Sequence, residues 1–214
     1  MASKLKSTLL ALGVLSVFVQ GCSKPAPVSD TTAMVSKKAV ELRTNMRKLW
    51  EDHITWTRLV IVSTAANLPD AAATTDRLLQ NQADIGNAIK PYYGDAAGDT
   101  LTSLLREHII GAANILAAAK AKDQAKLEAA KTAWYANADQ IATFLSGANP
   151  AAWPAADMQK MMKDHLDLTL SEAVNQLQGH YPESVADYDK VHEEILMMSD
   201  ALSDGIVKQF PDKF

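Results

Sequence analysis

The sequence contains a single cysteine, Cys22, among its 214 residues. Everything after this residue must therefore fold without an internal disulfide bond and depends on its hydrophobic core alone. The same scarcity excludes a thiolate metal site, a covalently attached c-type haem and a cysteine nucleophile from that part of the chain.

An excess of positive charge is also lacking. The chain carries 21 Lys and Arg against 25 Asp and Glu, for a formal net charge of −4 at pH 7. Because no basic stripe occurs, we expect no nucleic-acid partner. A glycine-rich phosphate loop and a Gly-x-Ser-x-Gly nucleophile motif are absent too, so no residues support a kinase or a nucleotide transferase. We therefore expect a non-enzymatic protein.

The first residues are typical of a secretory signal peptide. Lys4 and Lys6 precede a short uncharged apolar run from Thr8 to Val19. This run is shorter than the ~20 residues that span a bilayer. The segment ending at Cys22 resembles the lipobox of bacterial lipoproteins. That resemblance implies that residues 1–21 are removed and that Cys22 receives lipid, including acyl chains such as palmitate.

The lipoprotein resemblance also implies a location in the cell envelope. Residues 22–35 comprise the lipidated Cys22 and a flexible tether that holds both early prolines. Ser23 and Lys24 follow the cysteine, with no aspartate at the second position. In a host with two membranes this implies the outer membrane, facing the periplasm; otherwise it implies the extracytoplasmic face of the plasma membrane. The expected partners are the membrane, through the lipid anchor, and an unidentified envelope protein or small ligand.

From residue 36 onward the sequence is typical of helices. Apolar residues recur at spacings of three and four, and most prolines and glycines fall where helices should end. These signals predict helices over about 35–66, 70–90, 96–121, 124–146, 155–178 and 183–209. Short connections favour antiparallel neighbours. Residues 36–214 are therefore predicted to form one all-α domain, a six-helix bundle built from three antiparallel helical hairpins.

One local pattern occurs three times in these helices. The segments LWEDHI, LLREHI and MMKDHL place histidines at positions 53, 108 and 165, which are 55 and 57 residues apart. Such a period indicates a helical hairpin used three times. In the second helix of each hairpin, Asn81, Asn137 and Glu194 follow the histidines by 28, 29 and 29 residues. Polar residues on apolar stripes need partners, so the pattern predicts a polar layer in the core.

Several interpretations of the histidines stay open. Each can be a core histidine whose hydrogen bonds are satisfied by neighbouring groups. Facing helices can also build a site for Zn, Fe or Cu, and Asp189 and His192 have a helical spacing suited to this. Met158, Met161 and His165 together favour copper(I), and two histidines can hold a haem. The metal-ligand candidates are His53, His108, His165, His192, Asp189 and Glu194.

Scattered stretches of the chain resemble a bacterial family of exported helical proteins. The matching segments are 49–58, 91–94, 134–139, 164–166 and 209–211. The resemblance implies a single helical unit and an exported location, but no activity. We therefore predict a membrane-anchored envelope lipoprotein that acts as a non-enzymatic binding or structural module. The alternative is a metal-binding or redox bundle, ferritin-like, with a histidine-based site in its core.

Overall fold

A computed structural model describes residues 36–214 of the chain. The predicted signal peptide, the lipidated Cys22 and the tether lie outside the described residues. The described part contains six α-helices, a short 3₁₀-helix and no strand. Their bounds are α1 Lys37–Ala66, α2 Ala71–Tyr93, α3 Asp95–Ala121, α4 Gln124–Ala148, α5 Ala155–Gln178, α6 Tyr181–Gln209 and η1 Pro211–Lys213.

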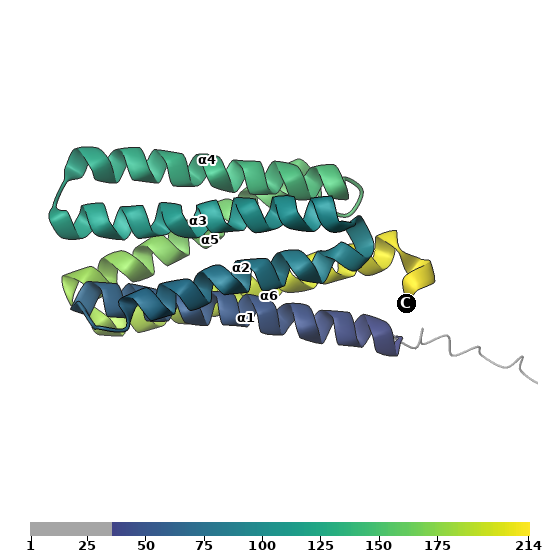
Figure 1. Ribbon diagram of the computed structural model, residues 1–214, viewed down its shortest axis with the longest axis horizontal. Helices are drawn as coiled ribbons and strands as arrows, with labels where there is room; N and C mark the ends of the chain where they lie inside the picture. The colour runs from purple at the N-terminus through teal and green to yellow at the C-terminus, as the bar shows by residue number, and fades with distance from the viewer. Residues whose placement is uncertain (1–35) are drawn as a thin grey trace, which may run out of the picture. The chain divides into compact units, whose positions relative to one another are not determined.

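The helices form a closed ring (Figure 1). Each helix packs antiparallel against the next one in the chain, and α6 returns to pack against α1. The predicted all-α fold with six helices in antiparallel hairpins is therefore confirmed. The order around the ring, which the sequence left open, places α1 in additional contact with α3 and α5. The odd-numbered helices run in one direction and the even-numbered helices in the other.

The helix ends follow the expected chemistry. Ser36 and Asp123 each accept a hydrogen bond from the backbone N–H three residues further on, which caps α1 and α4. Gly179 ends α5 with a φ of 79°, a left-handed conformation that costs glycine little. These caps explain why most predicted boundaries lie within two residues of the observed ones.

The end of α2 is an exception. We expected the helix to stop at residue 90, before Pro91, but it continues to Tyr93. Proline close to a helix end removes only one backbone hydrogen bond. Packing holds the extra turn, because the Tyr92 ring lies 6.0 Å from Phe210 and 5.6 Å from Phe214 between centroids.

The core is divided along the bundle axis. A larger apolar cluster includes Trp50, Ile85 and Met198, and a smaller one at the other end includes Val60, Leu78 and Ile109. Polar residues from all six helices lie between the two. Across residues 36–214, none of the helices combines the length and the hydropathy that membrane crossing requires.

Candidate functional site

Three histidines meet in the middle of the bundle. His53 on α1, His108 on α3 and His165 on α5 are each at most 4% exposed. Their ring centroids are 5.7 Å (53 to 165), 6.3 Å (108 to 165) and 6.5 Å (53 to 108) apart. The threefold sequence repeat explains this convergence, because it places a histidine at the same height on three helices that run in the same direction.

Each histidine is held by a residue 29 positions later, on the second helix of its own hairpin. All three hydrogen bonds use the Nδ1 atom of the ring. The pairs are His53–Gln82 at 3.3 Å, His108–Asn137 at 3.2 Å and His165–Glu194 at 2.9 Å. We call these six residues the histidine layer. Because Nδ1 faces the partner helix, Nε2 at the other edge of each ring is directed away from it.

The hydrogen bonds of the partner residues determine which ring nitrogen of each histidine carries the proton. Asn137 donates from Nδ2 to the carbonyl of Leu104 at 3.1 Å, so its Oδ1 accepts the Nδ1–H of His108. Glu194 accepts from the Nδ1–H of His165 through a carboxylate oxygen. The Nε2 atom of His108 therefore carries a lone pair, the form that binds a metal.

In the first hairpin, Asn81 and Gln82 together make the two hydrogen bonds that Asn137 makes alone in the second hairpin. Asn81 donates to the carbonyl of Leu49 at 3.0 Å, as Asn137 does to the carbonyl four residues before its own histidine. Gln82 instead faces His53, and its Nε2 also donates to the carbonyl of Leu78 at 2.7 Å. Asn81 thus belongs to the polar core as predicted, while the sequence analysis missed Gln82. A strict 29-residue spacing in all three hairpins was the signal for it.

Burial keeps two of the rings uncharged. Desolvation lowers the pKa of His53 well below its usual 6.5, and the nearby His165 and His108 lower it further. Desolvation also lowers the pKa of His108 to about 3, again with a contribution from His165. Both rings are consequently neutral near pH 7.

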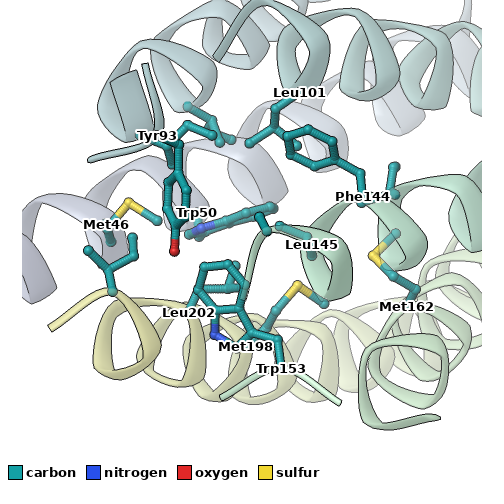
Figure 2. A pocket seen from close by; sticks show the side chains of 15 residues that line it. Met46, Trp50, Tyr93, Leu101, Phe144, Leu145, Trp153, Met162, Met198 and Leu202 are labelled. Carbon is teal, nitrogen blue, oxygen red and sulfur yellow. The ribbon is translucent and has the colours of Figure 1, made fainter. Parts of the chain in front are cut away.

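Apolar walls and aromatic rings enclose the layer. Trp134 stacks on His108 with centroids 5.2 Å apart and donates from Nε1 to the His108 carbonyl. Trp50 packs edge-on against His53 at 5.7 Å. On the Trp50 side lies an apolar cavity of ≈20 Å³ whose lining includes Met162 and Met198 (Figure 2). An apolar cavity of ≈40 Å³, lined in part by Trp134, lies on the other side.

The other predicted ligands do not reach the layer. His192 is half-buried on α6, where its Nε2 lies 2.8 Å from a Glu51 carboxylate oxygen. Asp189 is exposed. Met158 is buried and Met161 partly buried in the larger apolar cluster. Asp189 and His192 therefore lie on a solvated face of α6 and are not ligands of a core site.

A second buried polar cluster was also missed. Arg58 forms an ion pair with the buried Glu172 at 2.9 Å and donates to the hydroxyl of Ser184 at 2.7 Å. Burial raises the pKa of Glu172, which Arg58 partly offsets. These residues link α1, α5 and α6, and each satisfies hydrogen-bonding groups of the others. They therefore form a structural network.

In the observed conformation, no set of three or more His, Cys, Asp or Glu side chains in residues 36–214 is arranged to hold a metal ion.

Comparisons with known proteins found no significant match to a family model, a curated protein or a solved structure. The resemblance to exported bacterial proteins consequently stays a prediction from the sequence.

Proposed function

We propose that this protein binds one transition-metal ion between the Nε2 atoms of His53, His108 and His165. One observation carries the proposal: three buried imidazoles converge, and each is oriented through Nδ1 by a partner on the next helix. Metal-binding histidines are commonly oriented in this way, by a hydrogen bond from the ring nitrogen that does not bind the metal.

The required movement is small. With metal–nitrogen distances of about 2.0–2.1 Å, three imidazoles in one plane have centroids about 5.5 Å apart. The observed separations of 5.7, 6.3 and 6.5 Å are wider. Each ring would need to move inward by about half an ångström, a distance within the reach of side-chain adjustment in a bundle with small cavities on both sides of the layer.

Metal binding also requires a change at Gln82. The Nε2 of Gln82 faces the Nδ1 of His53, an arrangement that leaves the ring proton on the histidine Nε2. The Oε1 of Gln82 is buried without a partner among the described residues. A rotated amide would let this oxygen accept the Nδ1–H of His53 and free the histidine Nε2 for the metal. The rotation costs the hydrogen bonds that Gln82 Nε2 now donates to the Leu78 carbonyl and to Asn81 Oδ1.

The cavities support binding rather than catalysis. At ≈20 and ≈40 Å³, the spaces beside the layer are far smaller than the ~300–1,000 Å³ of typical ligand pockets. An organic substrate has no room there. We therefore propose a role in holding or passing on a metal ion.

The test is metal analysis of the full-length protein purified without a histidine tag. We expect one metal ion per chain, lost in His108→Ala and in His165→Ala. His192→Ala is the matched control, because this histidine lies outside the layer. Circular dichroism confirms that each variant is folded. A protein without stoichiometric metal after exposure to Zn²⁺, Fe²⁺ and Cu⁺, or unchanged binding in both layer variants, would contradict the proposal and leave the layer as a structural network.

We further propose that lipid on Cys22 anchors the bundle to a membrane of the cell envelope, facing the periplasm from the outer membrane in a host with two membranes and otherwise on the extracytoplasmic face of the plasma membrane. The support is the sequence of residues 1–22, which resembles a lipoprotein signal. Cys22→Ala should move the protein from the detergent phase to the aqueous phase in detergent partitioning. Unchanged partitioning would rule out the anchor without affecting the proposed metal site.

A further inference from the structure

We infer that the metal taken by the histidine layer is monovalent copper. This inference rests on the proposed function, since it names the ion for the same three ligands. Three features of the molecule carry it: the buried charge of the layer, the arrangement of its three rings and the thioethers that line the apolar cavity on the Trp50 side.

The charge balance favours a single positive charge. Three carboxylates are buried among the described residues: Glu172, Asp187 and Glu194. Glu172 is paired with Arg58 and Asp187 with Lys190, each at 2.9 Å. Glu194 contacts only His165 among cation-forming side chains in the described part of the chain.

Binding through Nε2 makes all three imidazoles neutral ligands, and the carboxylate of Glu194 beside His165 is then the negative charge of the filled layer. A monovalent ion gives the filled layer a net charge of zero, whereas a divalent ion leaves +1 in an apolar core. Buried charge without compensation is unfavourable. With an effective dielectric constant of about 20, one unit charge at roughly 6 Å changes affinity on the order of 100-fold.

The arrangement of the rings favours three-coordination. The ring planes are inclined by only 31–38° to one another, and the three separations are nearly equal. Three nearly equal separations exclude a stacked column and place the rings at the corners of a triangle, an arrangement that offers three imidazoles to one ion. Zinc sites are almost always tetrahedral and need a fourth ligand. Copper(I) accepts three nitrogen ligands, and the cavities above and below the layer are apolar.

Methionines line the apolar cavity on the Trp50 side of the histidine layer. Met46, Met162 and Met198 are among the residues that line this cavity, together with Trp50 (Figure 2). Met162 precedes His165 by one turn and Met198 follows Glu194 by one turn, so antiparallel helices place both on the same side. Thioether sulfur selects copper(I) over zinc. Of the methionines that the sequence suggested for copper(I), Met198 lines this cavity, while Met158 and Met161 do not.

The first experiment is a competition between copper(I) and zinc(II). The full-length protein is supplied with equal amounts of both ions, without oxygen and with a reductant, and colorimetric chelators for each ion report occupancy. We expect copper(I) to fill the site. If zinc(II) fills it instead, the copper assignment is wrong and the proposed metal binding stands. If neither ion binds, the proposed function itself fails.

Charge variants then test the reason for the selectivity. Glu194→Gln should weaken copper(I) binding about 10–100-fold, as loss of an orienting partner does. Asn137→Asp adds a carboxylate against His108, as Glu194 already stands against His165. This variant should move the zinc-to-copper affinity ratio toward zinc on the order of 100-fold. Glu51→Gln, at the surface, is the control and should leave both affinities unchanged. An unaltered ratio in Asn137→Asp, with the fold intact, would overturn the charge argument.

Discussion

At the scale of single residues, the 29-residue spacing is the most informative feature. It connects each histidine to the group that fixes its Nδ1, although those groups differ: an amide in Gln82 and Asn137 and a carboxylate in Glu194. The chemistry of the layer is therefore asymmetric while its geometry repeats. A helical hairpin copied three times, with each polar position then free to vary, would give this combination.

His108 should contribute strongly to stability without any metal. Truncation in His108→Ala leaves Asn137 Oδ1 without its donor, which costs about 1–3 kcal/mol, and removes the packing against Trp134. We expect a loss of about 2–4 kcal/mol in the free energy of unfolding and a Tm about 5–10 °C lower. Thermal and urea denaturation in the presence of a chelator measure both quantities.

His192→Ala provides the comparison for this variant. Its ion pair with Glu51 is largely solvated, and such pairs contribute about 0–1 kcal/mol. Equal losses in the two variants would mean that burial does not distinguish His108 from a surface histidine.

At the scale of helices, close approach explains glycines that helix propensity disfavours. A Cβ added to Gly98 on α3 would lie 2.6 Å from the carbonyl oxygen of Gly86 on α2. A Cβ added to Gly86 would lie 2.5 Å from the carbonyl oxygen of Gly98. The two helices therefore cross backbone to backbone, and this contact fixes the distance between the first hairpin and the second.

Gly98→Ala should destabilise the protein. The carbonyl of Gly86 belongs to the helix backbone and cannot rotate away from the added methyl group, so α2 and α3 must move apart. We expect the free energy of unfolding to fall by about 1–3 kcal/mol. Gly147→Ala is the matched control inside α4, where an added Cβ meets nothing within 4 Å. It should stabilise the protein by about 0.4–1 kcal/mol. Urea denaturation of both variants gives the sign of each change, and stabilisation by Gly98→Ala would show that the helices do not touch there.

At the scale of the whole molecule, closing the ring of six helices buries two imidazoles in neutral form. The folded-state pKa values of His53 and His108 are below the unfolded value of 6.5. Between these values the unfolded chain binds more protons than the folded one. The contribution of both groups is therefore present above pH 6.5 and is lost as the pH falls toward about 3.

Lowering the pH from 7 to 5 should thus weaken the metal-free protein. Each buried histidine contributes a slope approaching about 1.4 kcal/mol per pH unit, so both together give a loss of about 3–4 kcal/mol. Glu172 acts in the opposite direction, because its raised pKa favours the folded state at low pH. In His108→Gln the loss should fall by about half. Urea denaturation at both pH values measures these differences, and a stability independent of pH would mean that the rings are protonated when folded.

The sequence by itself determined the helices, because spacing, capping residues and turn residues act within a few positions of one another. It also determined that His53, His108 and His165 share one repeated setting, and that polar groups such as Asn137 lie near them. Tertiary structure alone decided the order of helices around the ring, the orientation of the Gln82 amide toward His53 and the placement of His192 at the surface. These features depend on how helices rotate and pack against distant parts of the chain. A helical period places a side chain on a face, but only packing decides what that face meets.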